Sequence, residues 1–116
     1  MRKLIASINM TLDGFCDHTS VEPDEEVHDY YADLLRNAGV ILYGRVTYQL
    51  MEYWRALVAK PSGEKSLDDF AITMDAVPKV VFSYTLTYLD WASARLAMQS
   101  LEAEVTLLKS QPGKDI

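Results

Sequence analysis

Three short apolar runs, each about the length of a β-strand, are the feature that most restricts how this chain can fold. They cover residues 4–8, 40–43 and 80–82. Nearly continuous apolar runs of this length are typical of strands that are buried on both faces, as in a parallel sheet. A shorter strand is expected near residues 94–96. The runs therefore predict a sheet with helices on both of its faces.

Helical patterns separate these runs. Apolar residues recur at intervals of three and four through residues 27–38, 50–58, 67–74 and 101–108. Gly39 is the expected C-cap of the first helix, Ser66 with Asp69 resembles a capping box for the third, and Ser100 is the expected N-cap of the last. Strands that alternate with helices over 116 residues predict one α/β domain, residues 1–116, with parallel strands.

The composition excludes several classes of protein. The net charge of −6 and the absence of any basic run argue against binding to nucleic acid or to an anionic membrane. The apolar run near the amino terminus is too short for a signal peptide or a membrane span. A single cysteine cannot form an internal disulfide, so a cytoplasmic location is expected.

A glycine separates the second apolar run from the helix that follows it. Gly44, Arg45 and Thr47 then stand at the start of that helix, where free N–H groups and the helix dipole attract anions. An arginine adds a charge-assisted contact, so the segment can bind phosphate, although a glycine at this position is more often only a tight turn. Ligands of parallel sheets bind beyond the carboxyl ends of the strands, where the loops at residues 9–14, 44–47 and 83–87 are expected to meet.

Two other kinds of site have weaker support. Cys16, Asp17 and His18, with His28 further on, could be metal ligands, but they lack the paired Cys or His spacing of zinc sites, and no metal is expected. No nucleophile elbow or serine, histidine and acid arrangement indicates a hydrolase. The aromatic residues are spaced as packing residues of helix faces, and Trp54 is the one most expected to line a cleft.

Four segments in register resemble landmarks of the dihydrofolate reductase superfamily. They are residues 7–15 (SINMTLDGF), 41–48 (ILYGRVTY) with Trp54, 78–83 (PKVVFS) and 112–116 (PGKDI). The branch that this chain resembles most is the reductase domain of bifunctional riboflavin-biosynthesis deaminase-reductases. The resemblance covers essentially the whole chain and implies a three-layer, mostly parallel sheet.

The resemblance implies an NADPH-dependent reductase. In that family the Gly-Arg-x-Thr turn and a serine turn after the next strand hold the phosphates and the adenosine ribose, which here are Gly44, Arg45 and Thr47 with Ser83 and Thr85. A guanidinium and hydroxyl donors suit the 2′-phosphate, which is a dianion. Because NADPH carries this phosphate and NADH does not, NADPH is expected to bind better than NADH.

The resemblance also places the loop with Asp13 and Gly14 near the nicotinamide and the substrate. Gly14 would allow close approach of the backbone, and Asp13 is the candidate catalytic residue. The alternative is a simple turn, because Asp-Gly is a strong turn signal in any protein.

The residues of the first expected helix do not identify the substrate. Folate-reducing relatives carry an acid on its inward face, whereas Val27, Tyr30 and Tyr31 occupy that face here, and the acids of residues 22–26 suit the helix dipole. Dihydrofolate is therefore less expected than a pyrimidine ribityl phosphate or another small carbonyl or imine.

In the family, residues that correspond to 112–116 begin a further strand, which leads to a paired-glycine turn and the final strands. The expected sheet thus lacks its C-terminal strands, which suggests a fragment, an inactive truncated product, or a site completed by a second chain in a homodimer. The competing functional hypothesis is a non-catalytic module that binds a nucleotide or mediates association.

Overall fold

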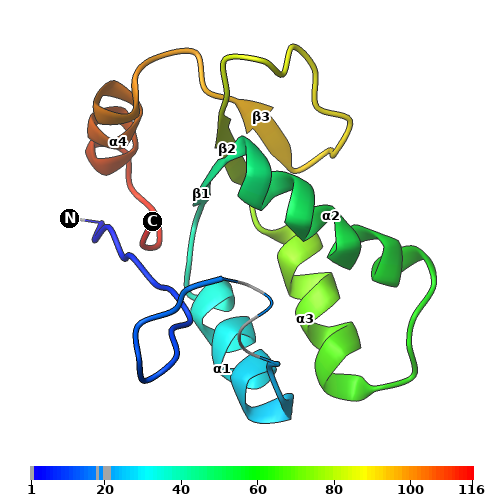
Figure 1. The fold of residues 1–116 in the computed structure, drawn as a ribbon. Helices are drawn as coiled ribbons and strands as arrows, with labels where there is room; N and C mark the ends of the chain where they lie inside the picture. Colours follow the sequence, from blue (N-terminus) through cyan, green and yellow to red (C-terminus); the bar gives the residue numbers. More distant parts are fainter. Residues whose placement is uncertain (1, 18, 20–21) are drawn as a thin grey trace.

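A computed structural model describes residues 2–17, 19 and 22–116. The elements follow one another as α1 (Glu25–Arg36), β1 (Ile41–Gly44), α2 (Arg45–Ala59), α3 (Lys65–Ala76), β2 (Lys79–Phe82), β3 (Ala94–Leu96) and α4 (Leu101–Ser110) (Figure 1). The three strands are parallel and lie in the order β1-β2-β3. The predicted α/β class is therefore confirmed, as are the strands expected near residues 40–43, 80–82 and 94–96.

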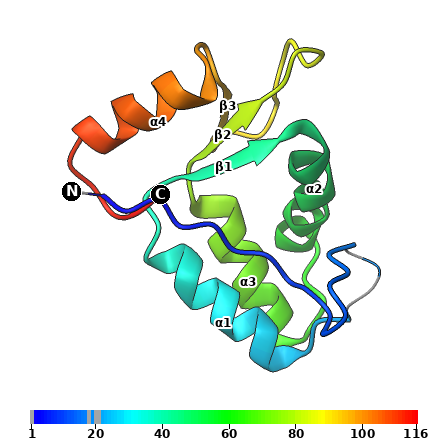
Figure 2. The same ribbon diagram turned by 60° about the vertical axis from the view of Figure 1, so that its left-hand side comes forward.

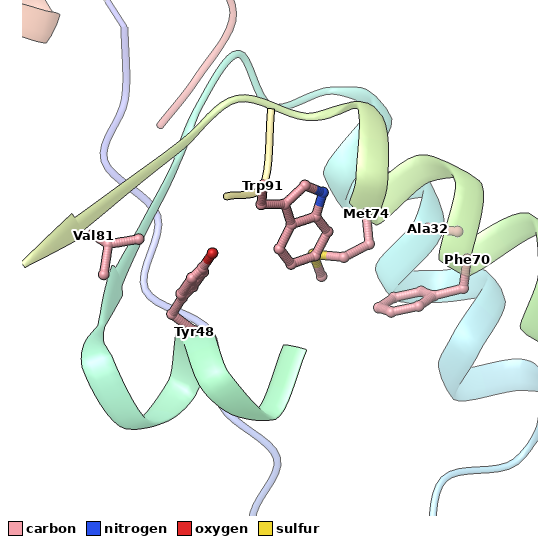
Figure 3. Packing of buried hydrophobic residues seen from close by; sticks show 6 residues of the cluster. All are labelled: Ala32, Tyr48, Phe70, Met74, Val81 and Trp91. Carbon is pink, nitrogen blue, oxygen red and sulfur yellow. The ribbon is translucent and has the colours of Figure 1, made fainter. Parts of the chain in front are cut away.

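Successive residues of β2 face opposite sides of the sheet. Val81 belongs to the larger core, which also contains Tyr48 of α2, Trp91 of the segment between β2 and β3, and side chains of α1 and α3 (Figure 3). Val80 belongs to the smaller core, where it packs with Leu108 of α4. The alternation is the ordinary period of a strand, and it places α4 on one face of the sheet and the other three helices on the opposite face (Figures 1 and 2).

Two helix starts are capped by side chains. Asp24 accepts a hydrogen bond from the Val27 N–H at 3.0 Å, and Ser100 accepts one from the Ala103 N–H at 3.2 Å. Such caps satisfy N–H groups that have no partner within the helix. The N-cap predicted at Ser100 is confirmed.

Two other predicted helix ends are wrong. Helix α1 ends at its C-cap Asn37, and the Gly39 N–H instead donates to the Asp115 carbonyl at 2.7 Å. Helix α3 begins after Glu64, so Ser66 lies inside the helix and no side chain caps it. The Asp68 carboxylate accepts hydrogen bonds from the N–H groups of Ser62 and Gly63 in the preceding loop. The acid that contacts the backbone before this helix is therefore Asp68, which was not part of the expected capping box.

The strand predicted at residues 4–8 is also wrong, because this segment is assigned to no strand and is exposed. Its ladder contacts are with the last residue: the Ile116 N–H donates to the Lys3 carbonyl at 2.8 Å, and the Ile5 N–H donates to the Ile116 carbonyl at 2.9 Å. A strand forms only where a neighbouring strand continues the pairing, and among the described residues the pairing here stops at Ile116.

The buried Arg2 holds the two ends of the described chain together. Its Nε donates to the Lys114 carbonyl at 2.5 Å, and its Nη1 donates to the Leu108 carbonyl at 3.1 Å. Gly39 and Gly113 make room for it, since a Cβ atom on Gly39 would lie 2.6 Å from Arg2 Nη2 and one on Gly113 would lie 3.2 Å from Arg2 Cζ.

Candidate functional site

The carboxyl ends of β1 and β2 lie side by side. Gly44 is in register with Phe82, so Ser83 follows directly beside the start of α2. Gly44 is the N-cap of α2, and Arg45 and Thr47 lie in its first turn. The structure therefore brings together two of the three predicted loops, because parallel strands end at one edge of a sheet.

The start of α2 is open and lacks negative charge. No side chain caps this helix and no acidic residue lies in its first turn. Gly44 has an ordinary φ of −79°, and nothing lies within 4 Å of the position that its Cβ would occupy. The glycine is not needed for the turn itself, but it leaves the first N–H groups of the helix accessible to an anion.

Arg45 is exposed, and its charge is not neutralised by an acid. Its Nη1 donates to Oε1 of Gln49, one helical turn away, at 3.1 Å. Within the described part of the chain, no ion pair joins Arg45 to a carboxylate. The guanidinium retains donors for a ligand that approaches this edge.

Ser83 shapes the turn after β2. Its Oγ accepts hydrogen bonds from the N–H groups of Thr85 and Leu86 at 3.2 and 3.1 Å, and lies 3.3 Å from Oγ1 of Thr85. The Ser83 side chain is half-buried and Thr85 is exposed. Both hydroxyls thus stand at the same edge as Arg45.

A cavity of about 580 Å³ opens beside Ser83, between the ends of β2 and β3 and the start of α4. Its volume is within the range of small-molecule sites. The residues that line it are Phe82, Ser83, Tyr84, Ala97, Met98, Gln99, Ser100 and Leu101.

Asp13 and Gly14 form a tight turn. The Gly14 N–H donates to the Thr11 carbonyl at 3.0 Å, the Thr11 hydroxyl donates to Oδ1 of Asp13 at 2.6 Å, and Gly14 has a φ of +95°, which favours glycine. The loop before it is held on α1, where the Tyr31 hydroxyl donates to Oδ1 of Asn9 at 2.8 Å.

In Figures 1 and 2 this loop lies beside the first turns of α1 rather than beside the start of α2. The expected meeting of all three loops at one edge is therefore wrong for residues 9–14. The reason is that the segment before them forms no strand of the sheet. A catalytic role for Asp13 stays a prediction.

Trp54 packs within the molecule instead of lining the cavity. Its ring lies 4.5 Å from that of Phe70 and 5.6 Å from that of His28, between centroids. The prediction that Trp54 lines a cleft is wrong for this cavity, because Trp54 lies on the face of α2 that contacts α3.

Of the residues considered as metal ligands, His28 packs against the Trp54 ring and Cys16 is exposed. His18, the third of the histidine and cysteine candidates for a metal, lies outside the described residues. In the described part of the chain no three His, Cys, Asp or Glu residues are grouped as a metal site would require.

Sequence reasoning missed a buried charged cluster at the opposite end of β2. The ammonium of Lys79 donates to the Val77 carbonyl and the Ser93 hydroxyl, both at 2.8 Å, and lies 4.1 Å from the centre of the Trp91 ring. The indole N–H of Trp91 donates to Oδ1 of Asp75 at 2.7 Å. Burial lowers the pKa of Lys79 to about 8, against a smaller opposite effect of Asp75. Period-two alternation places Lys79 on the same face as Val81, which is the signal that could have revealed it.

Comparisons with known proteins find an uncharacterized relative. No protein-family model matches the chain. The chain is similar to the uncharacterized protein YyaP of Bacillus subtilis (strain 168), with 33% identity over 118 residues, an alignment that covers 99% of this chain. The chain spans 61% of the length of that relative. Within residues 2–17, 19 and 22–116, none of the helices has the length and apolar character needed to cross a bilayer.

Proposed function

We propose that this chain is the cofactor-binding part of an NADPH-dependent reductase with the layered sheet of the dihydrofolate reductase superfamily. The observation that carries the proposal is the pairing of the uncapped start of α2, with its exposed Arg45, and the Ser83 turn at one edge of the sheet. A guanidinium, helix N–H groups and two hydroxyls suit the 2′-phosphate and ribose of NADPH.

The cavity beside Ser83 supports the same proposal. It lies next to the proposed phosphate contacts and is partly apolar, with Phe82 and Leu101 among its lining residues. An aromatic base can pack against such a surface while its phosphates contact the polar edge. In this proposal Gly44, Arg45, Thr47, Ser83 and Thr85 bind the cofactor. A contact between Gly14 and the nicotinamide stays a prediction from the resemblance, because the loop with Gly14 lies beside α1 and not at this edge.

Hydride transfer would come from the bound NADPH, and the protein would bind the cofactor and orient the substrate against it. The proposed substrate is a pyrimidine ribityl phosphate or another small carbonyl or imine compound. We further propose a cytoplasmic location, for which the single cysteine is the argument, and a homodimer, as the resemblance implies.

A binding titration tests the proposal. The folded chain should bind NADPH with a dissociation constant in the range of about 1 to 100 μM, and more tightly than NADH. Arg45→Ala should weaken NADPH binding at least about tenfold and reduce the preference for NADPH over NADH, because the guanidinium then no longer contacts the 2′-phosphate.

Arg36→Ala is the matched control. Arg36 is an exposed arginine at the end of α1 that pairs with Asp33, and its loss should leave NADPH binding unchanged. A folded chain that binds neither nucleotide would contradict the proposal and favour a non-catalytic association module.

A further inference from the structure

Helix α2 carries two arginines, and the structure gives them different partners. Arg55 donates to Oδ1 of Asp90 at 2.8 Å and to the Asp90 carbonyl at 3.1 Å. Arg45, the first residue of the helix, donates to Oε1 of Gln49 at 3.1 Å. One arginine is therefore paired with a carboxylate, whereas the other meets a neutral amide.

The contact between Arg55 and Asp90 is structural. The hydrogen bond between the two side chains raises the pKa of Arg55 and lowers the pKa of Asp90, so each charge stabilises the other. The Arg55 guanidinium also lies 5.9 Å from the centre of the buried Trp91 ring. This arginine joins α2 to the segment between β2 and β3, and its charge has a partner within the chain.

The contact between Arg45 and Gln49 leaves the charge of the arginine intact. A guanidinium has five N–H donors, and here the amide oxygen of Gln49 accepts from Nη1. An amide carries no net charge, so it orients the guanidinium without neutralising it. Both side chains are exposed, and the remaining donors can reach an anion.

The geometry of α2 makes residue 49 the neighbour that matters for Arg45. Side chains three and four positions apart meet on a helix surface. The residue three positions after Arg45 is Tyr48, which is 1% exposed and belongs to the core, so Gln49 is the exposed neighbour. A carboxylate at position 49 would pair with Arg45 as Asp90 pairs with Arg55. The side chain at position 49 thus controls whether the charge of Arg45 is free for a ligand.

We propose that Gln49 is a positioning residue that gives this site its preference for a dianionic phosphate ester. It holds the Arg45 guanidinium at the side of α2 and leaves its charge available to the 2′-phosphate of NADPH. The inference rests on the proposed function, because it takes the ligand to be NADPH. NADH lacks this phosphate, so its binding should depend little on residue 49.

Gln49→Glu tests the proposal, because it adds one charge with almost no change of volume. The introduced carboxylate should pair with Arg45 and repel the 2′-phosphate. NADPH binding should therefore weaken about tenfold at low ionic strength, while the dissociation constant of NADH should change by less than about twofold. Isothermal titration calorimetry of the folded variant with each cofactor measures both constants.

The salt dependence identifies the cause of the effect. Raising the ionic strength from about 0.01 to 1 M shortens the Debye length from about 30 to 3 Å, which screens exposed charges from one another. The difference in NADPH affinity between the wild type and Gln49→Glu should then fall from about tenfold to about twofold. A loss of binding caused by a distorted site would persist in high salt.

Gln111→Glu is the matched control. It makes the same substitution at an exposed glutamine after the end of α4, which lines a concavity with Lys79 and Ser93 at the amino end of the strands. The two variants have the same net charge, so Gln111→Glu should leave NADPH binding unchanged. In an Arg45→Ala background, Gln49→Glu should weaken NADPH by less than about threefold, because the guanidinium through which Gln49 acts is gone.

Three results would overturn the inference while the proposed function stands. They are NADPH binding that is equal in the wild type and Gln49→Glu, equal weakening by Gln49→Glu and Gln111→Glu, and equal loss of NADPH and NADH binding in Gln49→Glu. A wild-type chain that is folded by circular dichroism and binds neither cofactor would instead contradict the proposed function, and the inference with it.

Discussion

The two ends of β2 carry polar groups that are used in opposite ways. At its amino end, the ammonium of Lys79 is buried and donates to the Val77 carbonyl and the Ser93 hydroxyl over the face of Trp91. At its carboxyl end, Arg45 and Thr85 are exposed, and a cavity opens beside Ser83. The polar groups at the amino end are paired within the protein, whereas those at the carboxyl end are exposed, and the two groups lie at opposite ends of one four-residue strand.

This difference separates stability from binding. A buried donor must be paired within the protein, because an unpaired one costs the free energy of its lost hydration. An exposed arginine keeps its hydration and costs little, so its donors stay available to a ligand. We therefore expect substitutions at the amino end to change folding and substitutions at the carboxyl end to change binding.

Trp91→Ala should have the largest effect. Trp91 is 3% exposed, packs against Tyr48 and donates to Asp75, so its removal should lower the free energy of unfolding by about 3 to 5 kcal/mol. Tyr84→Ala at the carboxyl end removes a fully exposed ring and should change it by less than about 0.5 kcal/mol. Urea unfolding followed by circular dichroism measures both. Similar losses in the two variants would contradict the distinction between the ends.

The pH dependence of stability should report Lys79. Its pKa is about 8 in the folded chain, against an ordinary value of 10.5. Between these pH values Lys79 holds a proton in the unfolded chain that it has lost in the folded chain, so the contribution of Lys79 to the free energy of unfolding rises with pH from about 8 to 10.5. The rise is at most about 3.5 kcal/mol, at about 1.4 kcal/mol for each pKa unit.

Lys79→Met removes this titration while other groups titrate as before. The difference in unfolding free energy between the wild type and this variant should therefore increase in favour of the wild type over that range. Urea unfolding at several pH values measures it. A difference that does not vary with pH would mean that the ammonium is not desolvated as the structure indicates.

The smallest expected change in unfolding free energy comes from a comparison of two arginines, one buried and one exposed. Arg2→Ala removes two hydrogen bonds from a buried guanidinium to backbone carbonyls and should cost about 2 kcal/mol of unfolding free energy. Arg45→Ala should cost less than about 0.5 kcal/mol, because the side chain is exposed and its hydrogen bond is to Gln49. Thermal unfolding of both variants tests this. A loss at Arg45 as large as that at Arg2 would assign Arg45 a structural role.

Much of the fold could be predicted because its signals are local. The apolar runs that became β1 and β2 and the cap at Ser100 depend on neighbours in the sequence. The nearness of Gly44 to Ser83 follows once the strands are parallel, because Gly44 is the last residue of β1 and Ser83 follows the last residue of β2, with which Gly44 is paired.

The errors lie where a distant contact decides the structure. Residues 4–8 have the composition of a strand but meet one strand partner, Ile116. Gly39 is spaced as a helix cap, yet its close neighbour is Arg2, far away in the sequence. The position of Asp13 depends on the contact between Asn9 and Tyr31, which no local pattern predicts.

The packing of two glycines against one guanidinium has an evolutionary consequence. Any side chain at position 39 would collide with Arg2, and one at position 113 would press on it, so these three positions form a single steric unit. Loss of the arginine alone would not free the glycines, because a Cβ atom at position 39 would still lie 3.1 Å from the Lys114 carbonyl oxygen and Gly113 has a φ of +155°, which favours glycine. Among descendants of this sequence, we expect both glycines to be retained even where position 2 changes.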